Sequence, residues 1–332
     1  MPRQSRLDAP GVLHHVMGRG IEKRNIFIND ADRHDFIERL GALSNEGAMD
    51  IYAWALLPNH FHLLCKTRNR PLASSMRKLL TGYVVNFNHR HRRHGHLFQN
   101  RYKSIVCQED KYFKELVRYI HLNLLRAGLV DDFAHLAQSP WSGHSAVLGF
   151  CEFSWQDTEY VLSHFGHNHN GRSNYLQFVK EGTGQGRRPE LVGGGLVRSL
   201  GGWSEVLALR SREQKVIYDQ RILGDGKFVQ QVTKGLEDLE KRNLRLSRQR
   251  IDIDSLAARV SRQYKISVGE LCSGSRRQRV VQARAVLSWV GVRELGYSGA
   301  EVARYLGVTN SCVTRIAASD TRPPVEELIE AL

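Results

Sequence analysis

A hairpin signal inside an apolar stretch is the feature that most constrains the fold of this chain. Residues 50–66 read as two short strands joined by the turn-forming dipeptide Pro58-Asn59. Side chains alternate between the faces of a strand, so His60 and His62 project together from one face and Phe61 from the other. Two neighbouring imidazoles form half of a site for a divalent metal. The alternative is a pair of hydrogen-bonded sheet histidines.

The elements around this hairpin follow the order β-α-β-β-α-β and then a further helix. Two more strands are expected at residues 11–20 and 101–108, and helices are expected at residues 30–45 and 71–91. Asp30 can cap the first of these helices, and Pro71 is tolerated in the first turn of the second. This order predicts an α+β fold, in which a ferredoxin-like antiparallel sheet is covered by helices.

The helix expected at residues 110–127 carries polar side chains beside its apolar face. Tyr119 and Asn123 lie about 40° apart on one stripe of this helix, and Tyr112 falls on the same stripe two turns earlier. A carboxamide oxygen can join imidazoles around a hard cation, and a nearby phenol can attack a metal-polarised phosphate. The alternative reading of Tyr119 is ordinary packing of an amphipathic helix.

Composition indicates two domains and a polyanionic partner. The chain has 332 residues and a formal net charge of +14, which favours nucleic acid, with an acidic membrane surface as the alternative. No apolar run approaches the roughly 20 residues that span a bilayer, and the first residues lack the apolar core of a signal peptide. Five scattered cysteines without a Cys-x-x-Cys pair predict a reduced, cytoplasmic protein with no cysteine-built zinc site.

Residues 89–103 form a basic tract in which arginines, lysine and histidines interleave with aromatic side chains. This composition is typical of a single-strand binding surface, although a solvated charged loop is the alternative. The residues predicted to contact DNA from this tract, and from the end of the first strand, are Arg90, Arg92, Arg93, Arg101, Lys103, Arg19 and Arg24. Three further His-x-His pairs lie at residues 89–91, 94–96 and 167–169, among Arg, Gly and Asn, where metal geometry is poorly held.

Several motifs together resemble a known family, the single-tyrosine HUH transposases, and specifically the REP-associated tyrosine transposases of bacteria. The matching segments are Leu-Pro-Asn-His-Phe-His-Leu-Leu at 57–64, Gly-His-Leu-Phe-Gln-Asn-Arg-Tyr-Lys-Ser at 95–104, Tyr-Ile-His-Leu-Asn-Leu-Leu-Arg-Ala-Gly-Leu-Val at 119–130 and Pro-Trp-Ser-Gly-His at 140–144. The resemblance covers roughly residues 8 to 150, and its motifs follow the expected order.

This resemblance implies a particular chemistry. His60 and His62 would bind Mg²⁺ or Mn²⁺, and Asn123 would complete the site. Tyr119 would attack a phosphodiester of single-stranded DNA, leaving a 5′-phosphotyrosine and a free 3′-hydroxyl without a nucleotide cofactor. Family members recognise foldback hairpins, so hairpin DNA is the expected partner of a monomer or homodimer. The expected location is the cytoplasm, in association with the bacterial nucleoid.

The C-terminal part predicts a second DNA-binding element. Residues 151–250 read as a helical connector, with short helices at 158–165 and 174–181 and a highly charged helix at 236–250. Residues 251–332 read as a domain similar to the DNA-binding domain of the bacterial replication initiator, in which helices at 299–306 and 310–317 form a helix-turn-helix. The side chains that would face a major groove are Asn310, Ser311, Thr314 and Arg315. The alternative is a small helical bundle that only makes contacts within the chain.

These observations lead to one functional hypothesis and two rivals. The hypothesis is a metal-dependent DNA strand transferase, with the nuclease domain at residues 1–150. A transcription regulator with an inactive N-terminal domain is the first rival. A zinc hydrolase that uses His60 and His62 is the second, and the lack of a nearby glutamate base or third histidine weakens it.

Overall fold

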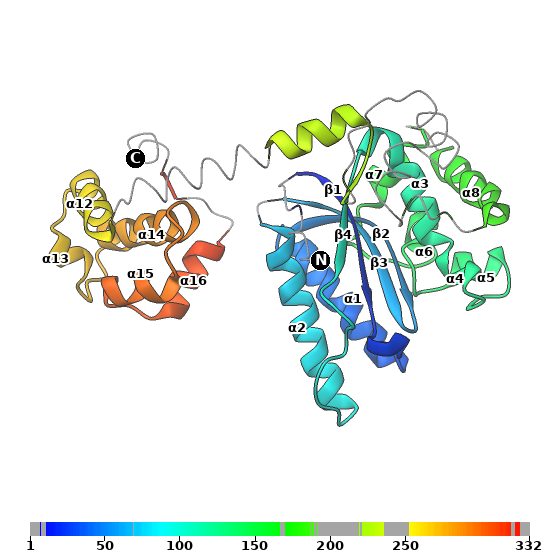
Figure 1. Cartoon of the computed structure of the whole chain (residues 1–332), viewed down its shortest axis with the longest axis horizontal. Helices are drawn as coiled ribbons and strands as arrows, with labels where there is room; N and C mark the ends of the chain where they lie inside the picture. The colour runs from blue at the N-terminus through cyan, green and yellow to red at the C-terminus, as the bar shows by residue number, and fades with distance from the viewer. Residues whose placement is uncertain are drawn as a thin grey trace. The chain divides into compact units, whose positions relative to one another are not determined.

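The computed structural model describes residues 7, 11–68, 70–166, 170–186, 188, 191, 219, 221–235, 252–319 and 323–325. The chain divides into two compact units, Met1–Thr233 and Lys234–Leu332. The first contains the sheet and the second is helical within its described residues (Figure 1). Each unit is therefore described by itself.

The first unit is built on a five-stranded sheet in the order β2-β3-β1-β4-β5. Four strands match the ones expected from the sequence and pair antiparallel; they are β1 (Leu13–Arg19), β2 (Met49–Leu57), β3 (His60–Thr67) and β4 (Lys103–Cys107). The fifth strand, β5 (Ile222–Leu223), pairs parallel with β4. The predicted antiparallel sheet is confirmed for its four strands, and β5, which was not predicted, adds a parallel edge that makes the whole sheet mixed. A two-residue strand carries no alternation that a sequence pattern could reveal.

Helices α1 (Asp30–Asn45) and α2 (Leu72–Arg90) cover one face of the sheet (Figure 1). Val16, Trp54, Phe61 and Leu63 point from three strands into this layer, where they are fully buried against apolar side chains of both helices. Phe61 packs against Phe36 of α1 with ring centroids 4.9 Å apart. The odd-numbered apolar residues of β3 are buried in this layer, and their burial fixes the register of the strand.

Helix α3 (Glu109–His121) covers the opposite face. The expected helix at 110–127 is not continuous, because α3 ends at His121 and a separate turn of helix, α4 (Asn123–Arg126), follows it. The side-chain Nδ2 of Asn123 donates to the backbone oxygens of Tyr119, at 2.9 Å, and Ile120, at 3.3 Å. A side chain that competes for these carbonyls favours a helix end at this point.

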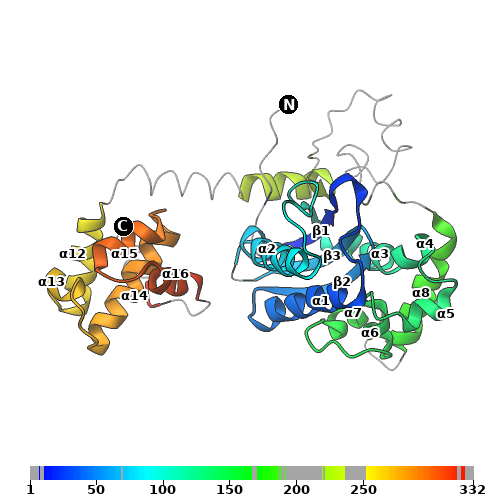
Figure 2. The same ribbon diagram turned by 90° about the horizontal axis from the view of Figure 1, so that it is seen from below.

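Short helices pack beside α3 and enlarge the second layer (Figure 2). They are α5 (Phe133–Gln138), α6 (His144–Leu148), α7 (Thr158–Ser163) and α8 (Gly171–Glu181). The sequence predicted helices near α7 and α8, but it did not predict α5 and α6, which contain only six and five residues. Two 3-10 turns, η1 (Ile21–Lys23) and η2 (Thr183–Gln185), also belong to this unit, and residues 226–233, which follow β5, are helical.

The second unit contains α12 (Ile253–Tyr264), α13 (Val268–Leu271), α14 (Gln278–Arg293), α15 (Gly299–Leu306) and α16 (Asn310–Ala318). Its core is formed by buried Leu, Val and Ala side chains of all five helices. The charged helix expected at 236–250 lies outside the described residues. Among the helices of the described ranges, none has the length and apolar character that a membrane span requires.

A buried carboxylate joins the start of α1 to the end of α2. Asp32 has no solvent exposure, and its side chain accepts hydrogen bonds from the backbone N–H of Ile28, at 2.8 Å, and of Asn29, at 3.3 Å. Arg90, the last residue of α2, and His91, which follows it, also bind Asp32. Burial alone would raise the pKa of Asp32, but the hydrogen bonds from His91, Ile28 and Arg90 outweigh it and lower the pKa below 3.8.

We predict that Asp32→Asn lowers the free energy of unfolding by about 1.5–3 kcal/mol, because it removes hydrogen bonds to a charged group. Asp30→Asn is the matched control: Asp30 is an exposed residue of the same helix, and its ion pair with Arg33 should be worth less than about 1 kcal/mol. Urea denaturation measures both effects. The lowered pKa means that ionised Asp32 stabilises the fold above about pH 4, so the difference between wild type and Asp32→Asn should shrink below that pH. A difference that is equal at pH 7 and pH 3 would contradict this role.

Candidate functional site

The sheet face below α3 carries the polar residues of the candidate site. Across the β1–β3 pairing, His60 lies opposite Arg19 and His62 lies opposite Met17. Met17 also lies opposite Lys103 of β4. Directly paired residues share a face of a sheet, so these side chains lie together on the side opposite to Phe61.

Helix α3 places Tyr119 above this group of side chains. The Tyr119 ring lies 5.8 Å from the ring of His62 and 6.1 Å from the ring of His15, with edge-to-face geometry in both cases. The rings of His60 and His62 are 5.3 Å apart. The structure therefore brings together three of the predicted residues, namely the two histidines and the tyrosine, from elements that are far apart in the sequence.

These residues line a cavity of about 400 Å³ whose wall is basic. Three of the arginines and lysines predicted to contact DNA, Arg19, Arg101 and Lys103, are part of this wall. Backbone hydrogen bonds from Ile21 to Leu97 and from Gln99 to Arg19, each 2.9 Å long, hold the loop before β4 against the end of β1. Because of this pairing, Gln99, Asn100 and Arg101 reach the cavity.

Both histidines are neutral at neutral pH. Burial, and secondarily the charge of Arg19, lowers the pKa of His60 to about 4. Burial, followed by the neighbouring rings of His15 and His60, lowers the pKa of His62 well below its ordinary value. Neutral imidazole is the form that binds metals, because its second ring nitrogen keeps a lone pair.

The ring nitrogens of His60 and His62 fit a divalent metal. Nδ1 of His60 lies 2.6 Å from Oδ1 of Asn59. Nδ1 of His62 lies 3.0 Å from Nε2 of His15. Each ring therefore keeps Nε2 for a ligand, which suits a metal centre. Within the described part of the chain, no cluster of three His, Cys, Asp or Glu side chains suited to a metal is found.

Asn123 is the residue that was predicted as a third ligand. It is half-buried at the start of α4, four residues after Tyr119, and is not among the described residues that line the cavity. Its Nδ2 is occupied by the carbonyls of Tyr119 and Ile120, whereas those bonds do not use its Oδ1. The structure therefore does not bring Asn123 into the described wall of this cavity, and its role as a ligand stays a prediction.

The other predicted DNA contacts of the first unit are not among the described residues of the cavity wall. Arg24 forms an exposed ion pair with Glu22, at 3.1 Å, and Arg90 is bound to buried Asp32. The guanidinium of Arg93 lies 5.7 Å from the ring centroid of Phe87, and Arg92 is exposed with φ of 51°. Arg24 and Arg90 therefore already have acidic partners within the fold.

The predicted residues of the second unit lie on one helix. Thr309 caps α16 through a hydrogen bond to the backbone of Cys312, while Gly307, with φ of 67°, ends α15. Val313 is buried against the core of this unit. The predicted groove-facing residues Asn310, Ser311, Thr314 and Arg315 are all exposed.

Three residues of the site were not predicted from the sequence as functional, namely His15, Asn59 and Arg126. The guanidinium of Arg126 lies 5.6 Å from the ring centroid of Tyr119, and its Nη2 donates to the carbonyl of Gly182 at 3.2 Å. Within the described part of the chain, its buried Nε and Nη1 have no hydrogen-bond partner. Strand alternation could have indicated His15, because it shares a face with Met17; no local pattern indicates Arg126.

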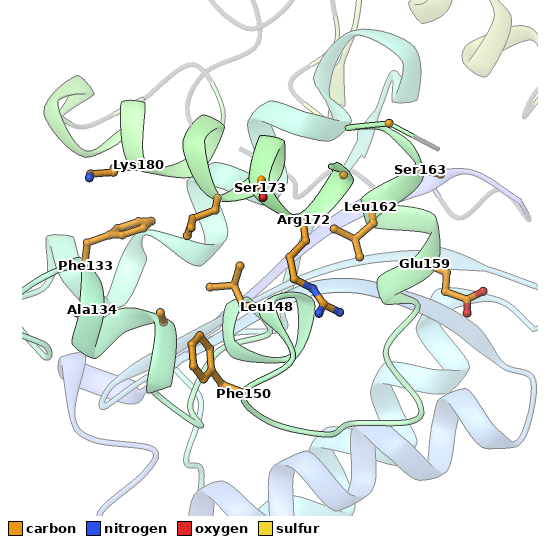
Figure 3. Close-up of a pocket in the computed structure, with 14 residues that line it drawn as sticks. Phe133, Ala134, Leu148, Phe150, Glu159, Leu162, Ser163, Arg172, Ser173 and Lys180 are labelled. Atoms are coloured by element: carbon orange, nitrogen blue, oxygen red, sulfur yellow. The ribbon is translucent and has the colours of Figure 1, made fainter. Parts of the chain in front are cut away.

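A second, larger cavity of about 1030 Å³ lies between α5, α6, α7 and α8 (Figure 3). Phe133, Leu148, Phe150 and Leu162 form much of its wall, and Arg172 points into it. The residues predicted from the sequence are not among the described residues that line this cavity. Size alone therefore does not identify the chemical site, whereas the group around His60, His62 and Tyr119 has the required functional groups.

The N-terminal segment of the chain is similar to a known protein family. Residues 10–123 match the model of a family described as "Transposase IS200 like", which confirms the predicted resemblance for this segment and supports a transposase-like role in DNA processing. A solved structure of a REP-associated tyrosine transposase bound to a REP hairpin is similar over 47% of this chain and 98% of that one, with 16% sequence identity and a TM-score of 0.38. A search of curated proteins finds no match.

We predict that the His60 ring stays neutral far into the acidic range. In an NMR titration of the metal-free protein, its C2 proton signal should shift with a midpoint near pH 4, because burial and Arg19 disfavour the charged ring. Free histidine in the same buffer, with a pKa of about 6.5, is the reference. A midpoint close to that of the reference would show that the His60 ring is solvated rather than held in the cavity wall.

Proposed function

We propose that this chain, of which residues 10–123 match the IS200-like transposase family, is a metal-dependent single-stranded DNA endonuclease and strand transferase. We propose further that it acts on hairpin-forming repeat DNA at the bacterial nucleoid, as a monomer or homodimer. The single observation that carries the proposal is the position of Tyr119, whose ring lies 5.8 Å from that of His62 in a basic cavity.

Tyr119 is the nucleophile of this reaction. Its phenol oxygen attacks the phosphorus of a phosphodiester, the bond from phosphorus to the 3′ oxygen breaks, and a 5′-phosphotyrosine forms. The phenol loses its proton and the departing 3′ oxygen gains one, so that a free 3′-hydroxyl results. One ester replaces another, so the reverse attack by a 3′-hydroxyl rejoins strands without an external energy source.

The surrounding residues assist this exchange. His60, His62 and the oxygen of Asn123 would hold Mg²⁺ or Mn²⁺, which supplies positive charge that polarises the phosphate. The guanidinium of Arg126, 5.6 Å from the centroid of the Tyr119 ring, places a positive charge beside the nucleophile. Arg19, Arg101 and Lys103 line the same cavity and suit the phosphates that flank the scissile bond.

We propose a separate DNA contact for the second unit. α15 and α16 have the order, the tight Gly307 turn and the buried Val313 that a helix-turn-helix requires. Asn310, Ser311, Thr314 and Arg315 would then contact base edges or phosphates of duplex DNA. The exposure of these four side chains supports this role.

We predict that Tyr119→Phe abolishes covalent attachment to DNA, because it removes the attacking oxygen and little else. The full chain is mixed with Mn²⁺ and a labelled single-stranded hairpin, and an SDS-resistant adduct is measured. Tyr112→Phe is the matched control, since Tyr112 is a half-buried tyrosine of the same helix that packs on the core. Wild type and Tyr112→Phe should form the adduct equally, and chelation of the metal should prevent it.

Two outcomes of this experiment would contradict the proposal. An adduct that persists in Tyr119→Phe would make another residue the nucleophile. Complete lack of cleavage by the wild type, together with tight binding to duplex DNA, would favour the transcription regulator with an inactive N-terminal domain.

We predict that Arg315→Ala weakens binding to duplex DNA selected by the full chain from a random pool. If Arg315 contacts a base, the binding free energy should fall by about 1–3 kcal/mol. If it contacts a phosphate, binding should weaken equally for all DNA sequences, and the slope of log affinity against log salt concentration should fall by about one. Fluorescence anisotropy at several salt concentrations measures both quantities. Arg304→Ala, on the exposed side of α15, is the control that should bind like wild type. Equal affinities of wild type and Arg315→Ala would exclude this surface.

A further inference from the structure

Each of the two histidines of the proposed metal site makes a side-chain hydrogen bond through the same ring atom, Nδ1. Asn59 Oδ1 lies 2.6 Å from Nδ1 of His60, and His15 Nε2 lies 3.0 Å from Nδ1 of His62. The second nitrogen of each ring, Nε2, is used by neither of these contacts. We propose that Asn59 and His15 are positioning residues, which hold His60 and His62 in the Nδ1–H tautomer and leave both Nε2 lone pairs for the metal.

The direction of the His60 contact follows from a chain of hydrogen bonds. The Nδ2 group of Asn59 donates to the backbone carbonyl of Lys23 at 3.1 Å, and a carbonyl can only accept. The other end of the Asn59 amide, Oδ1, is therefore the atom that faces His60. Because Oδ1 is also only an acceptor, the proton in this contact belongs to Nδ1 of His60.

The backbone that presents the Lys23 carbonyl is held in an uncommon conformation. Glu22 and Lys23 have φ of 51° and 64°, in the left-handed region that side chains other than glycine rarely adopt. A Cβ on Gly20 would lie 2.0 Å from the carbonyl oxygen of Arg24, so this turn closes only over glycine. Its other end is anchored on the hairpin, where the carbonyl of Pro58 accepts from the N–H of Ile26, at 2.7 Å. Strain of this kind persists where the surroundings enforce it, often at functional sites.

The His62 contact lies inside the sheet. His15 is fully buried on β1, directly opposite Leu64, and its ring stacks on that of His62 with centroids 5.2 Å apart. Two neutral imidazoles that touch through nitrogen share one proton, so one ring donates and the other accepts. If Nε2 of His62 binds a metal, Nδ1 of His62 must carry the proton, and Nε2 of His15 accepts it.

This inference rests on the proposed function, because the Nδ1–H tautomer matters only if Nε2 of each ring binds a metal. In free histidine the neutral ring carries its proton mostly on Nε2, which is the form that cannot bind a metal through that atom. A site that holds the other tautomer in advance is preorganised for the ion. Asn59 and His15 would therefore raise metal affinity without touching the metal.

The first test reads the tautomers directly in the metal-free full chain. Two-bond ¹H–¹⁵N correlation spectra of histidine-labelled protein distinguish protonated from unprotonated ring nitrogens, and the variants His60→Gln and His62→Gln assign the signals. Both rings should carry the proton on Nδ1. A proton on Nε2 of either ring would overturn the proposal for that ring.

The second test measures Mn²⁺ affinity by calorimetry. Asn59→Ala and His15→Leu should each bind Mn²⁺ about 10–100-fold more weakly, the usual effect of losing a residue that orients a metal ligand. Asn59→Asp and His15→Gln each place an acceptor oxygen near the ligand ring and should restore most of the affinity. Asn86→Ala, at an exposed asparagine of α2, is the control that should bind like wild type.

The outcomes separate this inference from the proposed function. If wild type binds no Mn²⁺, the proposed metal-dependent activity fails, while the tautomers of the metal-free protein still decide the positioning role. If wild type binds Mn²⁺ and Asn59→Ala binds it equally well, the positioning role fails alone. Should His15→Leu not fold, the His62 tautomer in wild type and the His15→Gln affinity decide the role of His15.

Discussion

The whole first unit depends on the alternation of β3 between two buried layers. Phe61 packs into the layer of α1 and α2, while His60 and His62 on either side of it face the layer of α3. A shift of one residue in register would bury both imidazoles against α1 and α2 and expel Phe61 from its core. The hydrophobic contacts on one face of the sheet therefore hold the polar groups on the other face in place.

The position of β1 between β3 and β4 explains how the site acquires its remaining groups. One neighbour of β1 supplies the histidines, and the other supplies Lys103, while β1 itself contributes His15 and Arg19. The end of β1 also binds the loop that carries Arg101 through backbone hydrogen bonds. A basic wall beside neutral imidazoles results, which suits both a phosphodiester and a cation that polarises it.

Local patterns predicted the elements of the sheet layer well, and they failed where an element is short or depends on distant contacts. Alternation and helical spacing located β1 to β4 and α1 to α3, because each of these elements buries one face along its length. The parallel strand β5, α5 and α6 are too short to show a period. At the break between α3 and α4, the side chain of Asn123 bonds a backbone carbonyl of α3, and a pattern of apolar residues does not register such a bond.

The sequence by itself determined the two histidines on one strand face, Tyr119 beside the apolar face of its helix, and the excess of positive charge. Only the tertiary structure decided which basic residues face the site, since Arg101 lines the cavity whereas Arg90 is bound to buried Asp32. It alone also placed His15 against His62, 47 residues apart. The physical reason is the distance along the sequence over which each signal acts. Periodicity reports which face of a single element is buried, whereas contacts between distant elements depend on strand order, register and the paths of the turns.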